Sequence, residues 1–302
     1  MDKLFVTNVP DLTKWGTLSG IPVNDPRPYH CHTLEITISP GAPNYDDVVC
    51  EVARSIACAR LNNHYLMLWD EATTNRTPLT GEDQFVLIQA LSRGICSPGT
   101  RNLGEIPPCN DDHFKGHLVE VLLYCMRAYL AKSGEAHPCI FEPPYPKAIP
   151  ASPGIDLLEV GGIDDELYFQ VWECKGTDGD ARAALRDAAD QLCVSNGTAY
   201  QGFMQAYRCL QTNDSVVRDS PLFQFINRMP RMFFQVPAHD SKRFGGVVGF
   251  NTDNSSSPAN SFATKVNNAV GPSRKHCQVV LFKIANFPQF RRDVFQQLWS
   301  IF

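Results

Sequence analysis

The amino-acid sequence predicts an α/β protein, in which strands and helices alternate along 302 residues. Two short apolar runs rich in β-forming residues, separated by a turn of glycines and acids, predict a β-hairpin between Gly154 and Lys175. Upstream of it, apolar side chains recur at helical spacing from Asn110 to about Lys132. Downstream, 276–284 has the strongest strand signal of the C-terminal half. These three segments define the expected core.

The composition is that of a folded protein with one large or two modest domains, since 43% of the residues are hydrophobic and 20% are charged. Its eleven cysteines form no Cys-x-x-Cys pair, so neither a disulfide framework nor a zinc ribbon is expected. The sequence contains no apolar run long enough for a membrane span and no secretion signal at its start. We therefore expect a cytoplasmic protein with free thiols and no membrane partner.

The first 108 residues are expected to form an α+β region beside the core. Alternating apolar residues predict a strand at 34–38, and helical spacing with acids at its start predicts a helix at 45–61. A short apolar run at 65–69 is interpreted as a strand, and Thr80 as the cap of a helix that ends near Gly94. We find no chemistry in this region.

The long helix that starts at Asn110 or Asp111 is apolar around much of its circumference, which indicates a central place in the core. Glu120 is the charged exception within this apolar stretch. His117 lies three residues earlier on the same side of the helix, so the two side chains could share a site.

The predicted hairpin carries charges where a buried strand should not. Asp156 lies near the start of its first strand, and Glu173 and Lys175 lie at the end of its second strand. Side chains two residues apart on a strand share a face, so Glu173 and Lys175 point one way and Cys174 points the other. Glu159 should face away from Asp156 for the same reason. Burial of such charges is costly unless they are paired or hold a metal.

The chain beyond the hairpin is expected to alternate again. A helix at 180–192 offers Gln191, and its Arg182 and Arg186 could either meet a phosphate backbone or form an exposed structural face. The remaining expected elements are a helix after Gly197, strands at 232–236 and 245–250, a short helix at 261–270, the strand at 276–284 and a closing amphipathic helix at 288–302.

The three charged residues of the hairpin suit metal-assisted cleavage of phosphodiesters. Two carboxylates on neighbouring strands can hold Mg²⁺ or Mn²⁺ through oxygen ligands and leave positions for water. A nearby ammonium can orient the attacking water and stabilise the charge that develops on the phosphoryl group. Asp156, Glu173 and Lys175 supply these groups.

At these residues the sequence resembles a known family. Gly-Ile-Asp followed by Trp-Glu-Cys-Lys is similar to the Asp and Glu-x-Lys signature of the PD-(D/E)xK, or restriction-endonuclease-like, nucleases. The resemblance implies a mixed central sheet flanked by helices, with a nuclease-like domain at 109–302 and an N-terminal α+β extension at 1–108. The sequence departs from the family pattern by having Gly-Ile directly before Asp156, with Pro153 one step earlier.

The resemblance also assigns roles. It implies that Asp156 and Glu173 bind the metal with help from Glu120, that Lys175 positions the water, and that Gln191 orients the water or the substrate. It implies a Mg²⁺-dependent (or Mn²⁺-dependent) deoxyribonuclease.

Within this superfamily the chain resembles the HamA nucleases of Hachiman-type antiphage defence. That resemblance implies a partner helicase, which holds the nuclease inactive and releases it on aberrant DNA. The net charge of −5, with 27 basic residues against 32 acidic ones, agrees with delivery to DNA by a partner. Local basic patches are still conceivable at three pairs of neighbours, 242–243, 274–275 and 291–292.

Two alternatives stay open. The chain could be a catalytically silent module that keeps the nuclease fold and binds DNA or a protein partner. It could also be an unrelated α/β enzyme that uses Cys174 or a histidine as nucleophile or base, although a thiol that faces the core is a poor nucleophile.

Overall fold

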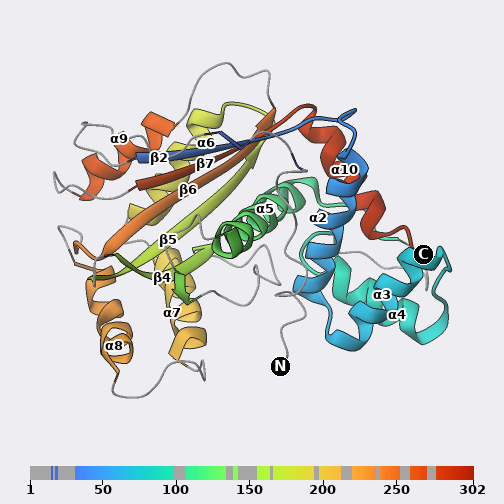
Figure 1. Ribbon diagram of the computed structural model, residues 1–302, viewed down its shortest axis with the longest axis horizontal. Coiled ribbons are helices and arrows are strands. Elements are labelled where there is room, and N and C mark those ends of the chain that lie inside the picture. Colours follow the sequence, from blue (N-terminus) through green and yellow to red (C-terminus); the bar gives the residue numbers. More distant parts are fainter. Residues whose placement is uncertain are drawn as a thin grey trace.

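The computed structural model describes residues 15, 18–19, 31–97, 106–133, 139–141, 155–163, 166–193, 197–211, 220–235, 239–251, 259–270 and 277–302. Its described strands form one sheet in the order β1-β2-β7-β6-β5-β4-β3 (Figure 1). The strands are β1 (Leu18–Ser19), β2 (Cys31–Ile38), β3 (Cys139–Phe141), β4 (Leu157–Ile163), β5 (Glu166–Thr177), β6 (Lys242–Asn251) and β7 (Cys277–Ile284). Five of them are long, and β1 and β3 are short edge strands.

Helices cover both faces of this sheet. They are α2 (Tyr45–Arg60), α3 (Asn63–Asn75), α4 (Gly81–Ser92), α5 (Asp111–Ser133), α6 (Ala181–Cys193), α7 (Gly197–Gln211), α8 (Pro221–Phe233), α9 (Ala259–Val270) and α10 (Phe287–Leu298). Among the described helices, none combines the length and the apolar character that crossing a membrane requires.

The predicted mixed sheet flanked by helices is confirmed. Strands β5, β6, β7 and β2 run parallel, whereas β4 pairs antiparallel with β5 as the predicted hairpin. Strand β2 comes from the expected N-terminal region and pairs with β7 along its whole length. The regions 1–108 and 109–302 therefore share one sheet.

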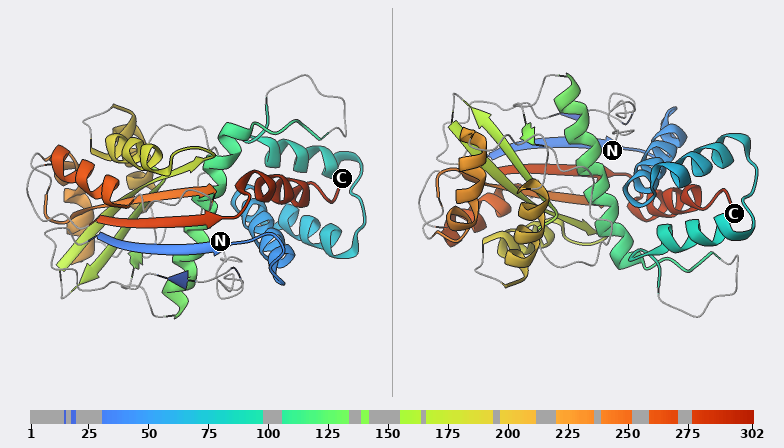
Figure 2. Two further views of the ribbon diagram at one scale, coloured as in Figure 1. Left: turned by 90° about the horizontal axis from the view of Figure 1, so that it is seen from above. Right: turned by 90° about the horizontal axis from the view of Figure 1, so that it is seen from below.

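Strand β5 contributes side chains to two separate cores. Phe169 and Val171 pack under α6, α7, α8 and α9, whereas Trp172 and Cys174 pack against α5. The alternation follows from the strand period of two residues. Figure 2 shows α5 between the sheet and the group formed by α2, α3, α4 and α10. Glu173 and Lys175 have the parity of Phe169 and Val171, so they point to the α6 face.

Two glycines let α5 approach the sheet closely. A Cβ atom on Gly176 of β5 would lie 2.5 Å from the carbonyl oxygen of Lys115, and one on Gly249 of β6 would lie 2.6 Å from Val119. A side chain at Gly176 would clash with the backbone of α5, and one at Gly249 would clash with the Val119 side chain. These contacts fix the segment of α5 that carries Glu120.

The interpretation of 65–69 as a strand was wrong, because these residues belong to α3. Asn62 caps the helix, and its side chain accepts a hydrogen bond of 3.0 Å from the backbone N–H of Tyr65. Leu66, Trp69 and Ala72 are buried at helical spacing, whereas Met67 is 65% exposed. The short apolar run looked like a strand because its aromatic residues also favour strands.

The interpretation of 232–236 as a strand was also wrong, because Met232 and Phe233 form the last turn of α8. Ser220 caps this helix and accepts a 3.1 Å hydrogen bond from the N–H of Phe223. Pro230 lies inside the last turn, where a proline is normally taken as the end of a helix. The buried side chains nevertheless follow the helical period along its whole length.

A buried arginine joins three segments near the end of β5. Arg291 of α10 is only 4% exposed, and its guanidinium donates to both oxygens of Asp111, at 3.1 and 2.8 Å, and to both oxygens of Asp178. Asp111 is in the first turn of α5, and Asp178 follows β5. Burial alone would lower the pKa of Arg291, but the two carboxylates outweigh it and raise the pKa. The ion pairs therefore tie α10 to α5 and β5.

We expect the two carboxylates to back each other up. Asp111→Ala and Asp178→Ala should each lower the free energy of unfolding by about 1 kcal/mol, and the double variant by about 3 kcal/mol, because only then is the buried guanidinium left uncompensated. Urea unfolding of the four proteins measures this. Asp112→Ala is the control, since its carboxylate is 84% exposed and pairs with Lys115 on the surface. If the double variant loses only the sum of the two single losses in free energy of unfolding, the two carboxylates do not compensate for each other.

Candidate functional site

The candidate site lies where β4 leaves β5. The N–H of Asp156 donates a 2.9 Å hydrogen bond to the carbonyl of Trp172, which extends the ladder one residue beyond β4. Alternate residues of a strand direct their backbone groups to the same neighbour, so the N–H of Cys174 also points toward β4. The Asp156 carboxylate accepts this N–H at 2.6 Å. The side chain thus replaces the next rung of the ladder at the point where pairing ends.

Glu173 and Lys175 extend from the same face of β5, as predicted. Glu173 is 5% exposed, and its carboxylate accepts a 3.0 Å hydrogen bond from the Lys175 ammonium. Cys174 points to the opposite face and packs with Trp172 in the α5 core. Glu173 is thus a buried carboxylate at the edge of an apolar core, and the partly exposed ammonium of Lys175 compensates its charge.

Three carboxylates act on the Lys175 ammonium. Burial favours the neutral amine and by itself lowers the pKa of Lys175, but the charges of Glu173, Asp187 and Asp156 outweigh it, so the pKa is raised. The side chain therefore stays protonated at neutral pH. Since Asp156 is among these groups, the hairpin brings the three predicted residues into one electrostatic cluster.

Helix α6 adds an acid that the sequence reasoning missed. Asp187 lies 3.3 Å from the Lys175 ammonium and also accepts a 3.3 Å hydrogen bond from the Gln191 side chain. Gln191 is therefore linked to the cluster through Asp187, one turn away on the same helix face. The signal for Asp187 was its spacing of four residues from Gln191, but its role depends on how α6 packs on β5.

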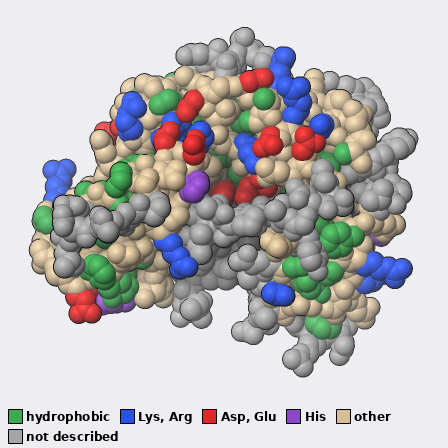
Figure 3. Space-filling model, turned by 180° about the vertical axis from the view of Figure 1, so that it is seen from behind, with side chains coloured by type: hydrophobic (Ala, Val, Ile, Leu, Met, Phe, Trp, Pro, Cys, Tyr) green, Lys and Arg blue, Asp and Glu red, His purple; other side chains and the backbone are tan. Residues whose placement is uncertain are grey.

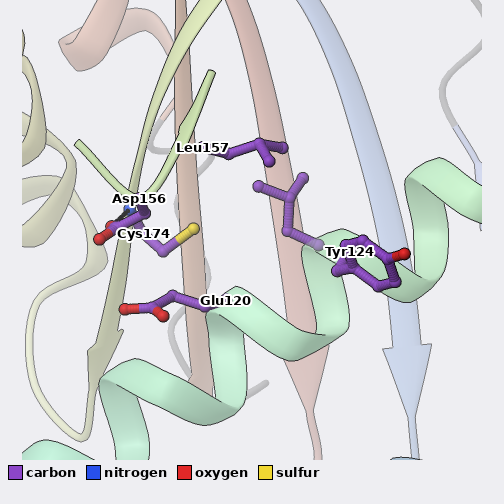
Figure 4. A pocket seen from close by; sticks show the side chains of 6 residues that line it. Glu120, Tyr124, Asp156, Leu157 and Cys174 are labelled. Carbon is purple, nitrogen blue, oxygen red and sulfur yellow. Dashed lines mark hydrogen bonds between the residues drawn. The ribbon is translucent and has the colours of Figure 1, made fainter. Parts of the chain in front are cut away.

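Glu120 approaches from the opposite side of the sheet. It is 8% exposed on α5, and His117 lies 3.4 Å from its carboxylate. Glu120 and Asp156 line a small pocket together with Cys174, and their carboxylates point to the same side of it (Figure 4). Asp156 therefore lies between two groups, with Glu120 on the α5 side and Glu173 on the α6 side.

Glu159 has a structural role on the α5 face. Its carboxylate accepts hydrogen bonds of 2.8 Å from both Arg127 and the Trp172 indole N–H. Glu159 was predicted to face away from Asp156; it lies on the α5 face, and its oxygens are engaged by neighbours outside the cluster.

The donor set suits a hard divalent cation held by few protein ligands. Within the described part of the chain, no group of three or more histidine, cysteine, aspartate or glutamate side chains is arranged to hold a metal ion. Magnesium sites in phosphoryl-transfer enzymes commonly use one or two carboxylates and leave the other positions to water and substrate phosphates. Asp156 and Glu173 can supply such a pair, with Glu120 on the far side of Asp156.

The two arginines of α6 are exposed but turned away from Lys175. At 3.6 residues per turn, Arg186 lies roughly 100° and Arg182 roughly 140° around the helix from Asp187. Asp190, on the same outer part of the helix, pairs with Lys265 of α9 at 3.0 Å. Both options for Arg182 and Arg186 stay open, because both side chains are exposed.

Seen from the α6 face, the molecule is hollowed at its centre. Figure 3 shows acidic side chains at the floor of this hollow, with basic and acidic side chains together along its upper rim. A polyanionic substrate would meet repulsion at this floor unless a cation is bound there.

No protein-family model matches the chain, and no curated protein matches it either.

Four of the described thiols are poor nucleophiles. Burial is the main cause that raises the pKa of Cys58 to about 11 and the pKa values of Cys109, Cys125 and Cys193 to about 12. At neutral pH these groups stay protonated, and the thiolate is the reactive form. This speaks against thiol chemistry at these four positions.

The same shifts predict a loss of stability at alkaline pH. Cys125 has its ordinary thiol pKa of 9.0 raised to about 12 in the folded chain, so its contribution is complete below pH 9.0 and is lost as the pH rises toward 12. Urea midpoints measured from pH 8 to 11 should therefore fall steeply for the wild type and less steeply for Cys125→Ala. Equal slopes would show that Cys125 does not contribute.

Proposed function

We propose that this protein is a metal-dependent nuclease that hydrolyses phosphodiester bonds of DNA. The observation that carries the proposal is the clustering of Asp156, Glu173 and Lys175 at the point where β4 separates from β5. Glu173 and Lys175 extend from β5 beyond the last residue that pairs with β4. The chemistry of these side chains is that of metal-assisted phosphoryl transfer.

Each residue has a role that its surroundings support. Asp156 and Glu173 would hold a Mg²⁺ or Mn²⁺ ion, with Glu120 assisting from α5. When bound, the ion would supply Lewis acidity at the phosphate and a more acidic water. Lys175 stays protonated among its carboxylates and can orient a water and stabilise negative charge on the phosphate.

Gln191 and Asp187 would act around Lys175. Asp187 accepts from both Lys175 and Gln191, so it can hold the ammonium when Glu173 turns to a cation. Gln191 has an amide that can donate to a water or to a phosphate oxygen. We assign Asp187 a positioning role, because it contacts Lys175 rather than the place of the substrate.

We extend the proposal to antiphage defence with a partner helicase, in line with the resemblance to HamA nucleases. The chain is acidic overall, with a net charge of −5, so its general attraction to DNA is weak. A helicase that brings DNA to the chain and separates its strands would compensate for this weak electrostatic attraction.

A catalytically silent module that binds DNA or a protein partner is the second candidate. It is favoured by the Glu173 carboxylate being neutralised by Lys175 and by the lack of a three-residue metal group among the described side chains. In that case the cluster would stabilise the sheet edge without turnover.

Cleavage assays separate the two candidates. We expect plasmid and linear DNA to be degraded with Mg²⁺ or Mn²⁺, alone or with the products of neighbouring genes. Glu173→Gln and Lys175→Gln should lower the rate by about 100-fold or more, because charge stabilisation at the phosphate is lost. Asp156→Asn should do the same while keeping an oxygen for the Cys174 N–H. Thermal unfolding of each variant checks that it folds.

Folded wild-type protein without cleavage under any of these conditions would favour the silent module. Cleavage that survives in Glu173→Gln and Asp156→Asn would place the active site elsewhere.

Asp187→Asn tests the positioning role separately. We expect kcat to fall by about 10-fold with KM nearly unchanged, since the partner of a catalytic group is lost. Asp190→Asn is the matched control, because its carboxylate lies on the same helix and pairs with Lys265 instead. Rescue by Asp187→Glu would support positioning, whereas equal effects of the two Asn variants would refute it.

A further inference from the structure

The outward face of α8 differs in charge from the chain as a whole. Its buried side holds Phe225, Ile226, Met229, Met232 and Phe233. Its exposed residues from the second turn onward are Gln224, Asn227, Arg228 and Arg231, followed by Phe234 just after the helix. This surface contains amides, guanidinium groups and an aromatic ring, and neither α7 nor α8 contains an acidic residue.

The surface continues onto α7. The Gln211 side chain donates to the Tyr207 hydroxyl at 2.6 Å and to Asn227 of α8 at 3.3 Å, which joins the C-terminal end of α7 to the middle of α8. Arg208 is exposed and lies one turn before Gln211. We call Arg208, Asn227, Arg228, Arg231 and Phe234 the α7–α8 surface. Figure 3 shows basic and apolar side chains together in this part of the molecule, at the lower right.

Arg228 and Arg231 lie three residues apart on one face of α8, and neither forms an ion pair with a described residue. The basic pairs predicted from the sequence are different. Lys242 is buried against the ring of Phe233, at 4.0 Å. Arg291 is buried between its two aspartates, and residues 274–275 lie outside the described part of the chain. Basic charge that can meet a large anion is thus available on α8.

The α7–α8 surface lies on the same side of the sheet as the candidate site. Phe225 and Phe233 of α8 pack in the same core as Phe169 and Val171 of β5. Glu173 follows Val171 on that face of the strand. The helices therefore stand beside β5 toward its N-terminal part, while Glu173 and Lys175 lie near its C-terminal end. The surface and the two charged residues thus share one face of the sheet.

We propose that the α7–α8 surface binds single-stranded nucleic acid, with the arginines on the phosphates and Phe234 against a base. That the bound strand is the substrate rests on the function proposed above. Arginines placed a helical turn apart can contact successive phosphates, and the described residues of α7 and α8 include no carboxylate that would repel the phosphate backbone. Phe234 is 46% exposed, and an exposed aromatic ring can stack on an unpaired base but not on one inside a duplex.

Direct binding tests this assignment without requiring cleavage. Fluorescence anisotropy of labelled single-stranded and duplex oligonucleotides would be measured with the full chain in EDTA, at several salt concentrations. Arg228→Gln/Arg231→Gln should weaken single-strand binding about tenfold and make the slope of log K against log salt shallower by about 1.4, which corresponds to two lost phosphate contacts. Phe234→Ala should weaken single-strand binding about tenfold and duplex binding much less.

Two controls separate this surface from general charge. Arg93→Gln/Arg292→Gln removes the same charge from exposed arginines of the α5 side and should leave binding unchanged. Asp190→Asn, whose carboxylate pairs with Lys265 outside this surface, should bind the single strand as the wild type does. Binding that depends on Arg228 and Arg231 without any cleavage would sustain the surface and count against the nuclease.

The proposal is overturned if the α8 double variant binds like the wild type, or if both double variants lose the same affinity. If cleavage is normal in that case, the proposed nuclease function stands and only the binding role of the α7–α8 surface is refuted. Equally tight, arginine-dependent binding of polyglutamate would also overturn it, because the surface would then accept an acidic polypeptide.

Discussion

The geometry of the candidate site depends on the ion pairs of Arg291. This guanidinium is buried between Asp111 at the start of α5 and Asp178 after β5, and it belongs to a third element, α10. Hydrogen bonds to two carboxylates fix the guanidinium plane, and the plane in turn fixes where α5 begins relative to the end of β5. The close contacts of Gly176 and Gly249 then seat the helix on the sheet. Glu120 and Glu173 can lie on either side of Asp156 only with this arrangement.

The alternating side chains of strand β5 contribute to the α5 core, to the α6 core and to the candidate site. Its odd-numbered residues build the α6 core as far as Val171 and then become charged at Glu173 and Lys175, while Trp172 and Cys174 continue the α5 core. The change from apolar to charged residues on one face coincides with the loss of the β4 neighbour. The site is therefore an edge of the hydrophobic core rather than an addition to its surface.

Much of the fold and of the candidate site could be predicted from the periodicity of the sequence, whereas the other features depended on how the elements pack. The hairpin, the shared face of Glu173 and Lys175 and the opposite direction of Cys174 follow from the two-residue period. The errors at 65–69 and 232–236 came from short apolar runs that a helix and a strand share, where the caps Asn62 and Ser220 were the decisive signals. Asp187 could not be recognised, because only the packing of α6 on β5 brings it to Lys175.

The hydrogen bond from the Cys174 N–H to the Asp156 carboxylate marks where the pairing of β4 with β5 ends. Zipping of the two strands by one more rung would draw residue 155 toward Cys174 and displace the carboxylate that now occupies that rung. The end of the ladder is thus set by competition between the Asp156 side chain and the backbone of residue 155 for the amide proton of Cys174. Two strands that end in this way need no other element to stop further pairing, because the Asp156 carboxylate already occupies the next hydrogen-bonding position.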